Sequence, residues 1–433
     1  METELTRIAE LARKRPRIKL QTLAHLINEK TLMGSQQEMP AKKAVGVDEK
    51  TKEEYGSNLE VNVKNLVERM KRQAYKPQPV KRVYIPKDGT NKKRPLGLPA
   101  YEDKLVQSVL SKILNAIYEQ EFLGCSYGFR PGRSCHDALK VLDSTIENER
   151  VSYIVDADIR GFFDNVEHQW MMKFLGERIE DQNILRLISR FLKAGIMENG
   201  QIYDTDMGTP QGGLISPVLG NIYLHYVLDL WFAKKIKKES LGEAHLIRYC
   251  DDFVCCFQYK EDANKFYEKL VERLKEFGLE MAEEKTRIIE FGRFAENNRA
   301  RRGESKPETF EFLGFTHYCS KNSKGYFTVK RKTSKKKFKA KLKKSKEWLK
   351  ANMHEPVLNL IKRLNTKLIG HYRYYGITGN YSMINSFKFR VTKQLFWALN
   401  RRSQRRSCNW NKFNRMLKIL PIAKPKIYVN MYA

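Results

Sequence analysis

The stretch that most constrains this chain is RYCDDFVCCF, residues 248–257, in which two adjacent aspartates stand between apolar and aromatic runs. Such flanks are typical of buried strands, and Asp tolerates the backbone angles of a tight turn. We therefore predict two short buried strands joined by a turn at Asp251 and Asp252. Adjacent carboxylates repel each other unless a cation lies between them. A divalent metal ion is one answer, and an ordinary surface turn is the other.

A second acidic segment, SYIVDADIRGFFDNVEH at 152–168, begins with a buried-strand pattern and then breaks at a glycine. If this strand lies beside the hairpin in one sheet, an acid near its end completes a three-carboxylate metal cage. Asp158 is best placed for this role, and Asp156, on the same face of the strand, is its rival. We expect Asp164 and Asn165 to cap the helix that follows.

The charge of the chain points to a polyanionic partner. Lys and Arg number 81 against 50 Asp and Glu, for a formal net charge of +31 and a pI near 9.7. Such an excess repels itself in the folded protein and is typical of proteins that bind nucleic acid. A ribosomal protein is usually shorter and less apolar than these 433 residues with 41% hydrophobic side chains. A membrane-surface protein would need a basic amphipathic terminus, which we do not find.

The cysteines and the apolar runs indicate an intracellular protein. The seven cysteines form no CxxC pair, so we expect buried thiols in a reducing cytoplasm and no zinc site. The N-terminus has no apolar core typical of a signal peptide, and no segment has the apolar length that spans a bilayer. We therefore predict a soluble protein of the bacterial cytoplasm or nucleoid that makes no membrane contact.

Two further segments carry groups suited to phosphates or bases. Residues 76–100 predict a hairpin with strands at 80–85 and 94–98 and a turn at 87–90. Its many Lys and Arg suit either a phosphate clamp or an ordinary solvated hairpin. The glycine-rich turn in 204–232 matches neither common nucleotide-binding glycine spacing. It suits close approach to a base pair and, equally well, a tight turn into a core helix.

Apolar periodicity predicts helices along much of the chain. We expect one or two short helices in residues 1–43, broken at Pro16 and at Gly34–Ser35, and an exposed loop at 293–309. Ser134 is expected to cap a helix at its N-terminus. Further helices are predicted at 59–72, 102–119, 168–194, 262–277 and 356–375.

From residue 321 onward the composition shifts to a basic helical module. Its first helix interleaves a few apolar residues with many lysines, as expected of a wall that faces nucleic acid. These lysines are Lys335, Lys336, Lys337, Lys339, Lys341, Lys343, Lys344, Lys346 and Lys350.

The motifs of the chain form an ordered series. They are KRPLGLP, YGFRPGRSCHDAL, DIRGFFDNVEH, GTPQGGLISP, YCDD, EEKTRII and FLGFTHY, and then LNTKLIGHYRYYG and LNRRSQRRSCNW. This series resembles the group II intron reverse transcriptase/maturase family from residue 44 to the end. The resemblance implies an α+β right-hand polymerase with fingers, palm and thumb. It implies an N-terminal extension at 1–43, fingers and palm at 44–320, and a basic helical thumb/maturase (X) domain at 321–433.

The resemblance also assigns roles to single residues by motif match. The catalytic residues and metal ligands would be Asp158, Asp251 and Asp252, which chooses Asp158 over Asp156 and implies two Mg²⁺ ions. Nucleotide-binding residues would be Lys87, Arg94, Phe163, Gln211 and Lys285. Phe163 would exclude a ribose 2′-hydroxyl, and Lys285 would protonate pyrophosphate. Contacts to primer or template would come from Tyr249, Cys250 and Gly314.

Two departures from the family pattern matter. Cys250 stands where the family commonly has Ala, a change that we expect to bear on fidelity or redox sensitivity. We find no Cys/His-rich nuclease segment after the maturase-like part, so we do not expect this protein to cleave DNA.

The function implied is that of an RNA-directed DNA polymerase that also binds its structured intron RNA and assists splicing and retromobility. Its partners would be that RNA, an RNA template with a DNA primer, and dNTPs, and the protein would be a monomer or a homodimer. Two alternatives stay open. One is a domesticated reverse transcriptase in defence or repair, and the other is an RNA-binding splicing maturase without polymerase activity.

Overall fold

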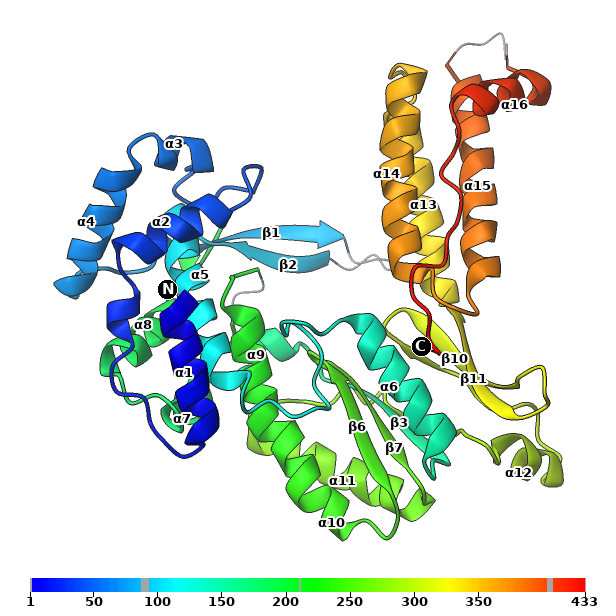
Figure 1. Cartoon of the computed structure of the whole chain (residues 1–433), viewed down its shortest axis with the longest axis horizontal. Helices are drawn as coiled ribbons and strands as arrows, with labels where there is room; N and C mark the ends of the chain where they lie inside the picture. The colour runs from blue at the N-terminus through cyan, green and yellow to red at the C-terminus, as the bar shows by residue number, and fades with distance from the viewer. Residues whose placement is uncertain (1, 87–92, 210–211, 403–407, 433) are drawn as a thin grey trace. The chain divides into compact units, whose positions relative to one another are not determined.

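The computed structural model describes residues 2–86, 93–209, 212–402 and 408–432. In it the chain divides into two compact units (Figure 1). The first unit is built from residues up to 86, from 93–138 and from 153–288, and the second is built from 139–152 and from residue 289 onward. The predicted segments, divided at residues 43 and 320, have other boundaries and stay a prediction.

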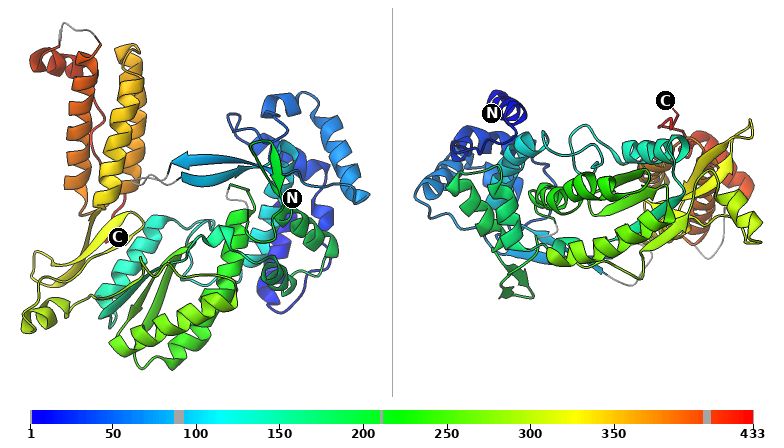
Figure 2. Two further views of the ribbon diagram at one scale, coloured as in Figure 1. Left: turned by 180° about the vertical axis from the view of Figure 1, so that it is seen from behind. Right: turned by 90° about the horizontal axis from the view of Figure 1, so that it is seen from below.

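The main sheet of the first unit has the strand order β6-β7-β3-β8. Its strands are β3 (Tyr153–Asp158), β6 (Ala244–Tyr249), β7 (Asp252–Phe257) and β8 (Arg287–Glu290). Strand β7 runs antiparallel to both β6 and β3, and every residue of β7 after Asp252 is buried. Helix α11 (Lys260–Glu276) packs on β3 and β7 (Figure 2). Continuous apolar residues on β7 fit this position, because a central strand is covered on both faces.

A second sheet of the first unit has the order β2-β1-β4-β5. Strands β1 (Val80–Pro86) and β2 (Lys93–Leu98) form the predicted basic hairpin, which is thereby confirmed. The predicted turn at 87–90 lies outside the described residues. The sheet is completed by β4 (Ile196–Glu198) and β5 (Gln201–Tyr203).

Besides α11, the first unit contains further helices. They are α1 (Glu2–Lys14), α2 (Glu29–Glu38), α3 (Lys52–Gly56), α4 (Leu59–Lys71), α5 (Tyr101–Tyr118), α7 (His168–Gly176), α8 (Gln182–Leu192), α9 (Ser216–Leu224) and α10 (Lys237–Glu239). Helix α6 (Cys135–Asn148) continues from the first unit into the second. At its start Ser134 and Asp137 bond reciprocally, side chain to backbone, which confirms Ser134 as the N-cap.

Two predicted helix boundaries are wrong. Gly34 and Ser35 lie inside α2 rather than at a break, because Asn28 and Thr31 form a capping box that starts this helix and Ser35 is buried in its packed face. The helical stretch predicted at 168–194 is two helices. The Asp181 side chain accepts hydrogen bonds from the backbone amides of Asn183 and Ile184, so Asp181 is the N-cap of a separate helix, α8.

The predicted capping by Asp164 and Asn165 is also wrong. Helix α7 begins later, at His168, with Glu167 preceding it. Asp164 lies in a 3₁₀ turn, Phe162–Asp164, and the Asn165 side chain donates to the carbonyl of Arg160 at 2.9 Å. The glycine break after β3 therefore leads into a separate tight turn, which the sequence pattern could not distinguish from a helix start.

The N-terminal segment is an integral part of the first unit. Helix α1 ends before Pro16, as predicted. The Leu20 amide then donates to the carbonyl of Arg178 at 2.9 Å, and the Asp181 carboxylate accepts from the amides of Leu23 and Ala24 at 2.7 and 2.8 Å. These bonds tie the extension to the loop between α7 and α8.

The second unit combines a small sheet with long helices. Its sheet has the order β11-β10-β9, made of β9 (Phe310–Phe312), β10 (Phe315–Lys321) and β11 (Phe327–Thr333). Its helices are α12 (Ala295–Arg301), α13 (Lys335–Ala351), α14 (Val357–Tyr375), α15 (Tyr381–Asn400) and α16 (Trp410–Ile419). Helix α12 replaces part of the loop predicted at 293–309. Among the described helices of the chain, none combines the length and apolarity needed to cross a membrane.

Candidate active site

In the β6–β7 hairpin, the turn lies one residue earlier in the chain than predicted. Tyr249 pairs with Asp252, so the two turn residues are Cys250 and Asp251, and Asp252 is the first residue of β7. The predicted turn at Asp251 and Asp252 is therefore wrong by one position. Cys250 has φ +61°, the left-handed region that a non-glycine residue rarely adopts. Glycine is the usual residue where a two-residue hairpin turn needs positive φ. Because Cys250 is apolar, the sequence pattern assigned it to the strand rather than to the turn.

Strand β3 brings the third aspartate to the same edge of the sheet. Asp158 is the Cα partner of Asp252 in the antiparallel pair of β3 and β7. Residues that are partners in such a pair have their side chains on one face, only about 5 Å apart at Cβ. The prediction that β3 lies beside the hairpin is confirmed. The rival Asp156 lies further along the strand, opposite Val254, and its carboxylate is 3.6 Å from the guanidinium of Arg287.

Lys285 forms an ion pair with Asp158. The segment before Lys285 is held against the end of β3, because the Ala282 amide donates to the Asp158 carbonyl at 2.8 Å. The Lys285 side chain is 54% exposed and so remains open to solvent. Among the described residues, the three aspartates do not form a cluster whose carboxylate oxygens all lie within 4.8 Å of one another. The donor set consists of carboxylate oxygens, which fits a hard divalent cation such as Mg²⁺.

Phe163 lies in the 3₁₀ turn after β3 and is fixed on two sides. Its carbonyl accepts from the Thr209 amide at 2.7 Å, and its ring lies so close to Gly220 that an added Cβ there would be 3.0 Å away. Phe163 and Asp164 line a hollow of about 630 Å³ together with residues of β1 and β2. Acids also line this hollow, namely Asp204, Asp206 and Glu198. Because these acids would repel a triphosphate, we do not assign the hollow to the nucleotide.

Two arginines of the basic hairpin lie near Asp164, in the turn that carries Phe163. Burial raises the pKa of Asp164, while Arg82 and Arg94 lower it in part, so both guanidinium groups lie within electrostatic reach of the turn that carries Phe163. Lys87 and Gln211 lie outside the described residues. Gly212 has φ +114°, and a Cβ there would be 2.5 Å from the carbonyl oxygen of Gly97 in β2. The glycine-rich turn thus approaches the backbone of the hairpin itself.

The predicted primer and template contacts fall in two places. Tyr249 and Cys250 belong to the aspartate hairpin, where Tyr249 is half-buried and Cys250 is only 4% exposed. Burial raises the pKa of the Cys250 thiol, which therefore stays protonated near neutral pH. Gly314 lies in the second unit, in the two-residue turn between β9 and β10. There both Leu313 and Gly314 have positive φ, and Tyr374 donates to the Leu313 carbonyl at 2.9 Å.

Sequence reasoning missed the polar groups beneath the hairpin. Arg248 and Asp229 are both fully buried and form an ion pair. An arginine inside an otherwise apolar strand was the available signal. The sequence alone does not identify Asp229 as its partner.

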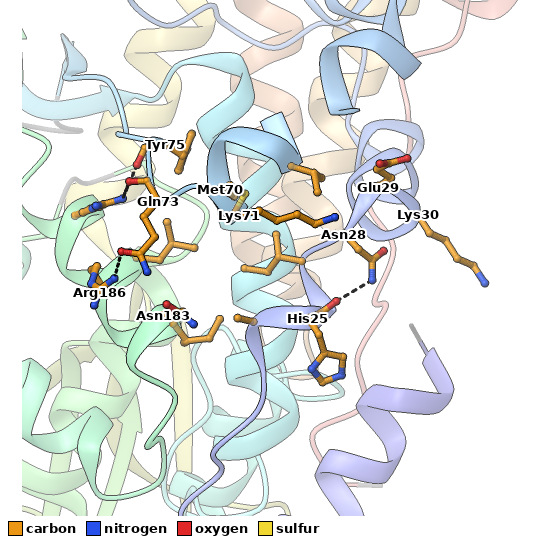
Figure 3. Close-up of a pocket in the computed structure, with 16 residues that line it drawn as sticks. His25, Asn28, Glu29, Lys30, Met70, Lys71, Gln73, Tyr75, Asn183 and Arg186 are labelled. Atoms are coloured by element: carbon orange, nitrogen blue, oxygen red, sulfur yellow. Dashed lines mark hydrogen bonds between the residues drawn. The ribbon is translucent and has the colours of Figure 1, made fainter. Parts of the chain in front are cut away.

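A second hollow of about 630 Å³ in the first unit was not foreseen (Figure 3). It is lined by residues of α4, α8 and the segment around α2, and Lys30, Lys71 and Arg186 make its polar lining basic. Arg186 bonds to the side chain of Gln73, as the figure shows. None of the predicted catalytic or nucleotide-binding residues lines it.

Comparison with known proteins gives the family. Residues 85–317, more than half of the chain, match the family described as reverse transcriptase (RNA-dependent DNA polymerase). The chain belongs to the reverse transcriptase family. All three aspartates and the ion-paired Lys285 of this reverse transcriptase lie inside the matched residues.

Its relatives include proteins of group II introns. The group II intron-encoded protein LtrA of Lactococcus lactis is 44% identical over 185 residues, which are 42% of this chain and 30% of that protein. Protein YkfC of Escherichia coli is 35% identical over 201 residues, 45% of this chain and 52% of that protein. Nuclear intron maturase 3 of Arabidopsis thaliana is 28% identical over 153 residues, 34% of this chain and 21% of that protein. The resemblance to group II intron reverse transcriptases and maturases is thereby confirmed, and the matches cover between a fifth and about half of these relatives.

Proposed function

We propose that this reverse transcriptase copies RNA into cDNA, with Asp158, Asp251 and Asp252 as its catalytic metal ligands. The observation that carries the proposal is the pairing of Asp158 with Asp252 across β3 and β7, beside the turn that presents Asp251. Three carboxylates at one edge of a sheet repel each other, and this repulsion favours binding of divalent cations. Asp158 and Asp251 would bind the ions tightly, while Asp252 would bind them less tightly and help to position them.

Two Mg²⁺ ions at these carboxylates would lower the pKa of the primer 3′-hydroxyl and stabilise charge on the leaving pyrophosphate. The surrounding side chains would handle the rest of the nucleotide. Arg94 would bind the triphosphate, because a guanidinium offers paired donors to phosphate oxygens. Phe163 would exclude a ribose 2′-hydroxyl by contact with the sugar. Lys285, which is exposed and next to Asp158, would give a proton to pyrophosphate.

The test is primer extension by the purified full chain on an RNA template with a DNA primer, dNTPs and Mg²⁺. The double variant Asp251→Ala, Asp252→Ala is assayed beside it. We expect cDNA from the natural protein and none from the variant, with both binding the primer-template. If neither protein extends the primer but both bind structured RNA tightly, the polymerase proposal fails and a splicing-factor role replaces it.

We also propose that the protein binds its own intron RNA and assists splicing. Support comes from the intron-encoded and maturase relatives and from the basic second unit. In α13 lysines fill most exposed positions, Glu347 is the one acid, and buried Phe338 and Leu349 hold the helix in place. Cations on a fixed helix bind phosphates without reading sequence. The test is splicing of a precursor RNA that contains the flanking intron, with and without the protein. No change in splicing rate would contradict this proposal.

A further inference from the structure

Arg248, near the end of β6, has no exposed side-chain surface. An unpaired buried charge costs several kcal/mol, so each of its donors needs a partner. Its Nε donates to Asp229 Oδ1 at 2.7 Å, and Nη2 donates to the other oxygen of the same carboxylate. Its Nη1 donates in two further directions, to Asn221 Oδ1 at 3.1 Å and to the carbonyl of Cys250 at 3.0 Å. The guanidinium therefore ties the turn of the aspartate hairpin to another element.

That other element is the long helical segment that begins with α9. Asn221 lies in α9, and Asp229 ends the π-helical turn His225–Asp229 that follows it. Both side chains are buried. π-helical turns are rare and often occur at functional sites. The widened turn here provides the carboxylate that neutralises Arg248.

Gly128 packs against the same hairpin turn. A Cβ added to Gly128 would lie 2.4 Å from the amide nitrogen of Cys250, so the loop backbone packs directly on the turn. The Gly128 carbonyl in turn accepts from Asn221 Nδ2 at 2.7 Å. Asn221 thus binds both groups that contact the turn, the guanidinium of Arg248 through its Oδ1 and the carbonyl of Gly128 through its Nδ2.

These contacts hold a strained conformation. A non-glycine residue in the left-handed region costs about 1–3 kcal/mol and persists where surrounding contacts over-determine it. Cys250, at φ +61°, is fixed through its carbonyl by Arg248 and packed at its amide by Gly128. Asp251 follows it in the turn, and Asp252 begins β7. The backbone angles at Cys250 therefore set where both carboxylates emerge.

We infer that Arg248, held by Asp229 and Asn221, is a positioning residue that fixes the turn from which Asp251 and Asp252 present their carboxylates. It acts through the backbone of Cys250 and contacts no substrate. The inference rests on the proposed polymerase function. Displacement of a catalytic group by about 1 Å can lower a rate about 100-fold, so a brace of this kind bears directly on nucleotide addition.

The test replaces the buried pair as a unit. The double variant Arg248→Met, Asp229→Leu removes both charges together, and such replacements are often neutral for stability because no lone charge stays buried. We expect the single-turnover rate of nucleotide addition to fall about 10- to 100-fold. The dNTP concentration at half-maximal rate should change by less than about 3-fold, and raised Mg²⁺ should restore part of the rate. A purely structural role would not produce this split.

A matched control is Arg178, another buried arginine of the same unit. It pairs with Glu121 and donates to the Pro16 carbonyl at 2.8 Å, away from the aspartate hairpin. The variant Arg178→Met, Glu121→Leu should match or exceed the first variant in loss of thermal stability and keep the natural rate of nucleotide addition.

A further variant covers the case in which the double variant does not fold. Asn221→Ala keeps the ion pair and removes the amide that binds Arg248 and Gly128. We expect its rate to fall about 3- to 10-fold with unchanged dNTP dependence. The inference is overturned if the double variant folds and adds nucleotides at the natural rate. It is also overturned if the double variant fails to fold and Asn221→Ala adds nucleotides at the natural rate. If the natural protein itself makes no cDNA, the proposed polymerase function fails instead.

Discussion

Asp158 and Asp252 are Cα partners across the antiparallel strands β3 and β7, which sets their side chains on one face of the sheet. Strand β3 also carries Asp156 on that face, because side chains two residues apart point the same way. Asp156 lies opposite Val254 and forms an ion pair with Arg287 at 3.6 Å. The same strand therefore contains a proposed metal ligand and a matched control of identical chemistry.

This pair gives the first prediction. Asp158→Asn should lower the rate of primer extension at least about 100-fold, because an amide is a weaker Mg²⁺ ligand than a carboxylate. Asp156→Asn should stay within about 3-fold of the natural rate, because Asp156 pairs with Arg287 rather than with the proposed metal ligands, and a partly exposed ion pair is worth about 1 kcal/mol. The measurement is the single-turnover rate at saturating dNTP. Equal losses in both variants would argue against a specific role for Asp158.

Gly128 and Gly124 provide a second comparison within one loop. Gly128→Ala places a Cβ 2.4 Å from the Cys250 amide nitrogen, whereas a Cβ at Gly124 meets nothing within 4 Å. The first substitution forces the Gly128 loop and the hairpin turn apart, so we expect nucleotide addition to slow about 10- to 100-fold. Gly124→Ala should leave the rate unchanged. The measurement is primer extension beside circular dichroism, and a natural rate for Gly128→Ala would mean that the turn tolerates displacement.

The extent of successful prediction differs between the sheet and its turns. Runs of apolar residues identified β3, β6 and β7, and the resemblance to the family indicated which of their acids meet. The register of the hairpin was missed by one residue, because Cys250 looks like a strand residue and its positive φ depends on Arg248 and Gly128. Local sequence does not contain those tertiary contacts.

Buried polar groups were the other gap. Arg248 in an apolar strand gave a signal, but its partners Asp229 and Asn221 lie on a distant helical segment that sequence periodicity does not align with β6. The predicted helix break at Gly34–Ser35 was wrong because a local signal was given too much weight. Their turn propensity is worth only about 1 kcal/mol per residue, which burial of a helix face outweighs.

The steric role proposed for Phe163 gives a third prediction. Phe163→Val should raise the ratio of ribonucleotide to deoxyribonucleotide incorporation about 100-fold, because the smaller side chain leaves room for a 2′-hydroxyl. The neighbouring Phe162 is a control, since its ring is buried and lies 5.0 Å from that of Phe163. Phe162→Leu should lower stability by about 1 kcal/mol and leave sugar selectivity unchanged. Competition assays with mixed nucleotides measure the ratio, and an unchanged ratio for Phe163→Val would remove the steric role.

Two substitutions of Lys285 distinguish the role of its positive charge from its role as a proton donor. Lys285→Met removes both, and Lys285→Arg keeps the positive charge beside Asp158 but does not release a proton at physiological pH. If Lys285 protonates pyrophosphate, both variants should slow nucleotide addition by about 100-fold while binding primer-template normally. Recovery of the natural rate by Lys285→Arg would assign the residue to charge neutralisation instead.

The last prediction concerns the stability of the second unit against acid. His371 in α14 is buried, its ring stacks on Phe387 at 3.9 Å between centroids, and burial lowers its pKa to about 3. In the unfolded chain a histidine has a pKa of about 6.5. The unfolded state therefore binds more protons between about pH 3 and 6.5, so stability rises with pH across this window and is lost as the pH falls below about 6.5.

The test compares His371→Phe with the natural protein. Phe keeps the stacking on Phe387 and cannot take up a proton, so its α14 should lose less stability on acidification. Between pH 7 and pH 5 the natural protein should lose about 2 kcal/mol more stability than His371→Phe. Hydrogen exchange of α14 amides at the two pH values measures this local free energy. His354→Gln, an exposed substitution in the same unit, should follow the natural protein. Equal acid losses in the natural protein and His371→Phe would mean that His371 is not the group whose protonation opens this helix.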